Sequence, residues 1–219
     1  MNSRKISQKD YAKLLELDKK VYPTDSPVTP AMLDNWFQNN PEFGAIFEDS
    51  GKISGMCIAI PLNETGWNKL ISGKLQESDL GKDTIFDNKR DVEIGIHIYH
   101  LEKFSSSNKQ FYVQTLNNLN KTITTLKNQN PKLKVIGFSG LCVTSSGINL
   151  FYNKLNCRER DFINPEHILR KNNKLQIFKS TSQKELEKKL SSGYEYANRC
   201  KMLVTYPDEL SLVWELLQH

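Results

Sequence analysis

The strongest constraint on the fold of this chain is a strand, a helix and a second strand in immediate succession. Between residues 91 and 101, aliphatic side chains occupy every second position, which is the period of a β-strand. Residues 112–126 repeat apolar side chains at intervals of three and four, which predicts an amphipathic helix. An apolar run at 133–143 predicts a second, buried strand. If the two strands are parallel, a right-handed crossover connects them.

The flanking segments predict further helices and a hairpin. A helix is expected after Ser7, and another opens at Thr29, which precedes a proline at the first helical position. A hairpin is expected with strands at 43–47 and 53–62, followed by a short helix and a loop at 63–90. The elements expected after the second strand are a helix at 145–155, one or two short strands within 158–178, a helix opened by a Ser182–Glu185 capping box, a strand at 202–206 and a helical stripe at 210–217.

This order of elements predicts an α/β (α+β) protein with a mixed central β-sheet flanked by helices. At 219 residues the chain is long for one domain and short for two, and its 38% of hydrophobic residues is enough for one sizeable core. We therefore expect a domain over residues 1–165. The C-terminal extension, residues 166–219, is expected to complete or cover the same domain.

Charge, cysteine usage and motifs exclude several functional classes. The net charge is +5, but basic and acidic residues alternate along the chain, so no nucleic-acid partner is expected. The four cysteines form no CxxC or Cys/His pattern, which predicts free thiols in a reducing compartment and no metal site. No signal core is present and no apolar run approaches the roughly 20 residues that span a bilayer, so a cytoplasmic location is expected. HExxH, GxSxG and Walker-type sequences are absent.

Two segments and the order of elements carry a resemblance to a known superfamily. Residues 147–157 look like a helix with an aromatic pair followed by Lys-Leu-Gly-Phe, with Asn156 and Cys157 standing where glycine and phenylalanine are usual. Residues 93–99 are similar to the fourth strand of the same superfamily. Over about residues 5–165 the chain resembles the GNAT N-acetyltransferases, which implies the acyl-CoA N-acyltransferase fold.

The resemblance implies acetyl-coenzyme A as the cofactor. In the superfamily, the end of the fourth strand offers backbone groups to the pantetheine arm, and the following turn receives the pyrophosphate. The positions that this implies for cofactor binding are Ile98, Tyr99, His100, Ser105, Ser106, Ser107, Asn108, Lys109, Gln110 and Asn149. The turn here contains no glycine, whereas the superfamily's loop is rich in arginine and glycine. Serine hydroxyls, backbone N–H groups and Lys109 could hold a diphosphate at the start of the next helix.

The resemblance also implies candidates for the chemistry of acyl transfer. Glu93 lies on the face of its strand opposite the aliphatic residues and is the candidate general base. His97 shares that face and is the alternative base, because histidine titrates near neutral pH. Tyr152 is the candidate general acid, although either Phe151 or Tyr152 could occupy the superfamily's tyrosine position. Each of these residues could instead be structural. The pair Glu77 and Asp79 could bind a cationic amine, or could be part of a solvated loop.

Three functions remain open from the sequence. The first is an N-acetyltransferase that moves an acyl group from acetyl-coenzyme A to the primary amine of a small molecule or peptide; such a chain could also form a homodimer. The second is a catalytically inactive GNAT-like binding module, which the glycine-free turn favours. The third is an unrelated α/β interaction protein, in which the fourth and fifth strands of the sheet would stay fully paired.

Overall fold

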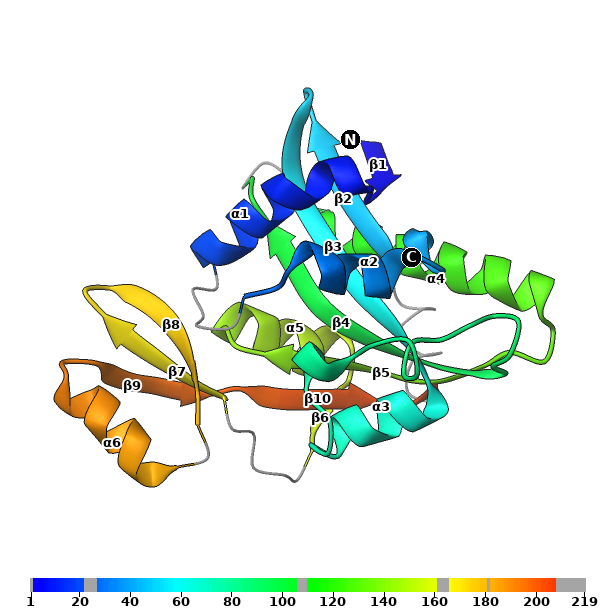
Figure 1. Ribbon diagram of the computed structural model, residues 1–219. Helices are drawn as coiled ribbons and strands as arrows, with labels where there is room; N and C mark the ends of the chain where they lie inside the picture. The colour runs from blue at the N-terminus through cyan, green and yellow to red at the C-terminus, as the bar shows by residue number, and fades with distance from the viewer. Residues whose placement is uncertain (1, 22–26, 106–109, 161–165, 181, 208–219) are drawn as a thin grey trace.

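The computed structural model describes residues 2–21, 27–105, 110–160, 166–180 and 182–207, and it contains two β-sheets with helices around them (Figure 1). The strands of the main sheet, in chain order, are β1 (Asn2–Lys5), β2 (Gly44–Asp49), β3 (Lys52–Asn63), β4 (Glu93–Lys103), β5 (Lys134–Cys142), β6 (Arg158–Glu159) and β10 (Lys201–Thr205). Their order across the sheet is β1-β2-β3-β4-β5-β10-β6. Neighbouring strands are antiparallel except β4 and β5, which are parallel.

Helices cover both faces of the main sheet. The α-helices are α1 (Tyr11–Val21), α2 (Pro30–Phe37), α3 (Glu64–Ile71), α4 (Phe111–Gln129), α5 (Ser145–Lys154) and α6 (Gln183–Ser191), and the single-turn 3-10 helices are η1 (Gln8–Asp10), η2 (Pro41–Phe43) and η3 (Glu77–Asp79). On one face, α1, α2 and α3 enclose a core that contains Trp36 and Trp67. On the other face, α4 and α5 enclose a core that contains Phe111 and Phe151. The expected mixed sheet flanked by helices is confirmed.

Local sequence signals explain where several helices begin. Thr29 accepts a hydrogen bond from the backbone N–H of Met32 at the start of α2, and Ser182 accepts one from Glu185 at the start of α6. Thr144 caps α5 in the same way. These side chains satisfy N–H groups that have no acceptor within the first turn of a helix. The helix starts expected at Thr29 and Ser182 are therefore confirmed.

The C-terminal part of the chain forms a small lobe and then returns to the main sheet. In the lobe, β7 (Glu166–Lys171), β8 (Lys174–Lys179) and β9 (Glu195–Arg199) form an antiparallel sheet in the order β8-β7-β9, with α6 beside it (Figure 1). From β9 the chain continues through Cys200 into β10, which lies between β5 and β6. Residues 1–165 therefore lack one inner strand of the main sheet.

Some elements differ from the expectation. β1 and β9 were not expected, because they are edge strands with few apolar side chains and show no clear alternation. The helical stripe expected at 210–217 lies outside the described residues. Val92 was expected in the core and is half exposed, at 50%.

The middle of the β4 face opposite the aliphatic residues is buried. Gly95 and His97 lie on this face, and the indole of Trp67 from α3 covers Gly95 so closely that a Cβ atom there would lie 2.1 Å from Trp67 Cγ. His97 is 0% exposed. This part of the face is closed because α3, a helix from another part of the chain, packs on it, whereas Glu93 and Tyr99 on the same face are only partly buried.

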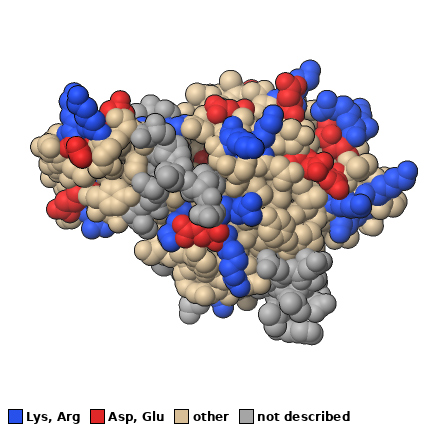
Figure 2. All heavy atoms as spheres, turned by 90° about the horizontal axis from the view of Figure 1, so that it is seen from below, with Lys and Arg blue, Asp and Glu red and all other residues tan. Residues whose placement is uncertain are grey.

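Neither the surface nor the described helices show a concentrated feature of one kind. In the view of Figure 2, basic and acidic side chains are interspersed and neither charge forms one continuous patch. Across the described residues, no helix combines the length and apolar character needed to cross a membrane, and no group of three potential metal ligands comes together. All four cysteines are buried, and each is a thiol that is not part of a disulfide.

Candidate active site

β4 and β5 separate part-way along their length. Their parallel pairing ends at His97 opposite Ser139, although β4 continues to Lys103 and β5 to Cys142. On the other side of β4, close to this point, a bulge interrupts the pairing with β3, and Tyr99 is the extra residue of β4 in the bulge. We call the space between the two strands beyond the last pair the wedge, and the His97–Ser139 pair its vertex. In these described strands, the full pairing expected for an unrelated interaction protein is not found.

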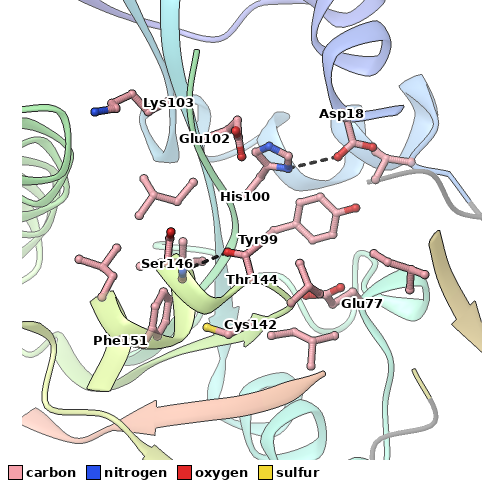
Figure 3. A pocket seen from close by; sticks show the side chains of 18 of the residues that line it. Asp18, Glu77, Tyr99, His100, Glu102, Lys103, Cys142, Thr144, Ser146 and Phe151 are labelled. Carbon is pink, nitrogen blue, oxygen red and sulfur yellow. Dashed lines mark hydrogen bonds and ion pairs between the residues drawn. The ribbon is translucent and has the colours of Figure 1, made fainter. Parts of the chain in front are cut away.

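A cavity of about 420 Å³ occupies the wedge (Figure 3). Residues 98–103 of β4 and residues 141–143 at the end of β5 line it. The elements α1, α2 and η3 also contribute side chains to it, as do α4 and α5 on the other face of the sheet and β8 of the small lobe. Side chains from the helices on both faces of the sheet therefore line the cavity.

A series of hydrogen bonds joins four elements at the vertex. Nε2 of His97 lies 2.6 Å from Oε1 of Glu77 in η3, and its Nδ1 lies 3.0 Å from Oγ of Ser139. The same Oγ accepts a hydrogen bond of 3.2 Å from the indole N–H of Trp67. His97 and Ser139 are 0% exposed, whereas Glu77 lines the cavity. The buried histidine thus contacts the cavity through a carboxylate.

A second carboxylate–histidine pair lies beyond the bulge. Nδ1 of His100 is 3.1 Å from Oδ1 of Asp18 in α1, and both residues line the cavity (Figure 3). Tyr99 packs on Trp36 of α2, with ring centroids 5.0 Å apart. Asp18 and Glu77 bring two carboxylates to the same side of the sheet, each paired with a histidine of β4.

The two candidate bases, Glu93 and His97, lie at different distances from the cavity. Glu93 is the first residue of β4, about 16 Å along the strand from Ile98 at roughly 3.3 Å per residue, and it does not line the cavity. His97 is closer, but both of its ring nitrogens are bonded to other side chains. A direct role as general base stays a prediction for either residue.

Phe151, and not Tyr152, lines the cavity. The ring of Phe151 packs over Gly140 of β5, where a Cβ atom would lie 2.5 Å from the ring. The hydroxyl of Tyr152 donates a hydrogen bond of 3.3 Å to Glu159 in β6. Partial burial and the charge of Glu159 raise the pKa of Tyr152 above its usual value. The hydroxyl of Tyr152 is therefore neutral and directed at the β6 edge of the sheet, and its role as general acid stays a prediction.

The positions implied for cofactor binding fall into several groups. Those that line the cavity are Ile98, Tyr99 and His100. Those that lie outside the described residues are Ser106, Ser107, Asn108 and Lys109. Ser105 and Gln110 flank that gap, and Gln110 immediately precedes the first turn of α4. Asn149 is exposed on α5 and accepts a hydrogen bond from Asn153, and it does not line the cavity.

Several cavity residues were missed by sequence reasoning. Asp18 reads locally as one more polar residue on an amphipathic helix, and no local signal shows that it is buried (7% exposed) against His100. Ile177 and Lys179 come from β8 in the C-terminal extension, which has no counterpart in the sequence motifs. Of the Glu77 and Asp79 pair, only Glu77 lines the cavity.

The thiol of Cys142 also lines the cavity, but it is not an activated nucleophile. Burial, and secondarily the charge of Glu77, raises its pKa to about 12. The thiolate is the reactive form of cysteine, so at neutral pH this side chain behaves as a small apolar group.

Known proteins resemble this chain in fold and not in sequence. The sequence matches no family model and no curated protein. Among solved structures, Arabidopsis thaliana Naa50 in complex with the bisubstrate analogue CoA-Ac-MVNAL aligns with a TM-score of 0.51 at 10% identity, covering 94% of this chain and 98% of that one. Chaetomium thermophilum Naa20 in complex with a bisubstrate analogue aligns at 0.52 and 9% identity, covering 97% and 90%. The loading GNATL domain of CurA from Lyngbya majuscula aligns at 0.53 and 12% identity, covering 94% and 96%.

The chain has the GNAT fold. The similarity extends over nearly the whole chain, including residues beyond the 5–165 over which the sequence resembles the superfamily. At identities of about 10% it establishes the architecture of the GNAT fold and not the identity of individual site residues.

Proposed function

We propose that this protein binds an acyl-coenzyme A in the wedge between β4 and β5 and transfers the acyl group to a primary amine. The observation that carries the proposal is the separation of these strands beyond His97 and Ser139 around a cavity of about 420 Å³. Acetyl-coenzyme A is the expected donor, and a cytoplasmic location is part of the proposal.

The wedge suits an extended thioester arm. Beyond the last pair, β4 presents a strand edge to the cavity, and such an edge can bond an extended ligand through its backbone groups. The first turn of α4, a helix of 19 residues, has N–H groups without intrahelical acceptors, and these favour an anionic group such as a diphosphate. Naa50 and Naa20, which share the fold at low identity, were solved in complex with bisubstrate analogues, and the analogue bound to Naa50 contains coenzyme A, which supports a coenzyme A ligand for this chain.

The state of Cys142 favours direct transfer from the thioester to the amine. An acyl-cysteine intermediate would require a thiolate, whereas the pKa of about 12 keeps this thiol protonated. No other cysteine lines the described cavity.

Calorimetric titration with acetyl-coenzyme A and desulfo-coenzyme A tests the proposal. Ser146 and Ser145 are adjacent, exposed residues in the first turn of α5, but only Ser146 lines the cavity. We expect Ser146→Trp to fill part of the cavity and weaken coenzyme binding by at least tenfold, which is about 1.4 kcal/mol. Ser145→Trp is the matched control and should bind like the wild type. Absence of heat with both ligands in the wild type, or equal weakening by both variants, would contradict the proposal.

A catalytically inactive coenzyme-binding module is the second candidate. The position of Phe151 in the cavity favours it, because phenylalanine offers no proton to a departing thiolate and the hydroxyl of Tyr152 is bonded to Glu159. Coenzyme binding without release of free thiol in the presence of amines would support this second function.

A further inference from the structure

The hydrogen bonds at the vertex form a series that runs from the buried indole of Trp67 to the carboxylate of Glu77 in the cavity. From this geometry, and on the basis of the proposed acyl transfer, we infer that Glu77 is the general base that accepts a proton from the acceptor amine. His97, Ser139 and Trp67 are positioning residues that hold this carboxylate.

Each donor in the group has one acceptor when His97 is neutral. The indole N–H of Trp67 can only donate, and its acceptor is Oγ of Ser139. The hydroxyl of Ser139 then donates to Nδ1 of His97, so the ring proton is on Nε2 and is donated to Oε1 of Glu77. Among the described residues, no donor is bonded to the other oxygen of Glu77, which leaves that oxygen for a group in the cavity.

The hydrogen-bonded series is buried at its Trp67 end and accessible from the cavity at its Glu77 end. Trp67 is 2% exposed and His97 and Ser139 are 0% exposed, so none of the three can exchange its partner for water without local opening. The side chain of Glu77 is 17% exposed and lines the cavity. A carboxylate held in this way loses little conformational freedom when it binds a substrate.

Glu77 lies at the vertex of the wedge, where the proposed function places the acyl group. His97 and Ser139 are the last paired residues of β4 and β5, so an acyl group seated in the wedge is closest to Glu77 at its vertex. Cys142, the last residue of β5, lies close enough to Glu77 for the charge of Glu77 to contribute, after burial, to its raised pKa. Two further carboxylates line the cavity away from the vertex: Asp18 is bonded to His100 beyond the bulge, and Glu102 lies two residues beyond His100 on β4.

The proposed step balances as follows. One proton of the ammonium group passes to Glu77, and the freed nitrogen lone pair forms the bond to the acyl carbon. The carbon–sulfur bond breaks with its electron pair on sulfur, and a second proton from the nitrogen passes to the departing thiolate. The third hydrogen remains on the amide nitrogen, and Glu77 returns its proton to solvent. This route needs no hydroxyl from Tyr152.

Thiol release from acetyl-coenzyme A tests the role of Glu77, with n-propylamine, putrescine, spermidine and a peptide with a free N-terminus as probes. We expect Glu77→Gln to lower kcat by about 10²-fold with the affinity for acetyl-coenzyme A unchanged. Asp79→Asn is the matched control, because Asp79 is in the same turn and exposed but does not line the cavity. It should keep the wild-type kcat. A Glu77→Gln protein with wild-type kcat would overturn the inference.

Two substitutions of His97 separate positioning from a purely structural role. Gln can still donate a hydrogen bond to Glu77, whereas Leu cannot. We expect His97→Gln to retain severalfold more kcat than His97→Leu, with KM for acetyl-coenzyme A little changed in both. Equal losses in the two folded variants would overturn the positioning role. If His97→Leu does not fold, the comparison of Glu77→Gln with Asp79→Asn still decides the role of Glu77.

The same measurements distinguish failure of the inference from failure of the proposed function. A wild-type protein that binds coenzyme A but releases no thiol with any of the four amines overturns the role of Glu77 and leaves the coenzyme site intact. A wild-type protein that binds neither acetyl-coenzyme A nor desulfo-coenzyme A removes the proposed function as well.

Discussion

At the scale of single residues, the vertex depends on two glycines that face each other across the parallel strands. Gly95 of β4 is opposite Gly137 of β5, and the indole of Trp67 lies over both. A Cβ atom at Gly137 would lie 2.6 Å from the indole ring and 2.7 Å from the backbone oxygen of Thr205. Only residues without a side chain allow the indole to approach the sheet closely enough to bond Ser139.

Gly95→Ala is expected to destabilise the fold by roughly 1–3 kcal/mol, because the new methyl group overlaps the indole of Trp67 and both are packed in the core. Urea unfolding followed by tryptophan fluorescence measures the change. Gly81→Ala is the control, since no atom lies within 4 Å of a Cβ built there. It should leave the free energy of unfolding unchanged or slightly raised. Equal effects of the two substitutions would contradict the packing described here.

The residue scale also shows where sequence reasoning ends. Alternation in β4 correctly places Ile94, Ile96 and Ile98 in the core, because it depends only on neighbours along one strand. The burial of His97 depends on Trp67, which reaches it from another element, and no local pattern records that contact. The resemblance led to the expectation that β4 and β5 separate but left open which residue of the aromatic pair faces the gap.

At the scale of elements, the start of the chain is held by a buried carboxylate. Asp10 accepts hydrogen bonds from the backbone N–H and hydroxyl of Ser7, which closes a capping box at η1. It also accepts two hydrogen bonds from Arg4 in β1, at 2.8 and 2.9 Å. These donors, Arg4 foremost, lower the pKa of Asp10 to about 2. The ionised carboxylate therefore fixes the edge strand to the first helical turn.

Asp10→Asn tests this link through its pH dependence. Because the pKa of Asp10 is lower in the folded than in the unfolded chain, its stabilisation is complete above the usual value of 3.8 and is lost as pH falls to about 2. Allowing for the partial exposure of Arg4, we expect the wild type to exceed the variant by roughly 1–2 kcal/mol at neutral pH. Urea unfolding should show the difference shrinking near pH 2. A difference that is the same at both pH values would rule out the ionised carboxylate as its source.

Elements differ in how well the sequence marks them. α2 and α6 begin at caps whose donor and acceptor lie three residues apart, so the local sequence is enough to predict where these helices start. β1 and β9 pair through the backbone of polar segments, and their existence depends on partners elsewhere, β2 and β7. The separation of β4 and β5 is likewise a property of two strands together and could be expected only through the resemblance.

At the scale of the whole molecule, the C-terminal extension is joined to the main sheet by β10. β10 pairs with β5 on one side and with β6 on the other. Its residues Met202, Leu203 and Val204 are buried, and Leu203 is part of the core beneath α4 and α5.

A chain ending at residue 165 is expected not to fold cooperatively, because β5 and β6 lose their common partner and the apolar surface that β10 covers becomes exposed to water. Thermal unfolding followed by far-UV circular dichroism measures the cooperativity of unfolding and the Tm of the truncated chain. A single cooperative transition with a Tm close to that of the full chain would show instead that the first 165 residues are self-sufficient.

One uninterrupted run of backbone, from Glu195 to Thr205 with Cys200 between its two halves, belongs to both sheets. Ile177 and Lys179 of the lobe line the cavity, and β10 pairs with β5, the strand on one side of the wedge. The small lobe and the β5 side of the wedge are therefore joined by continuous backbone, and Cys200 is the residue at which the chain passes from one sheet to the other.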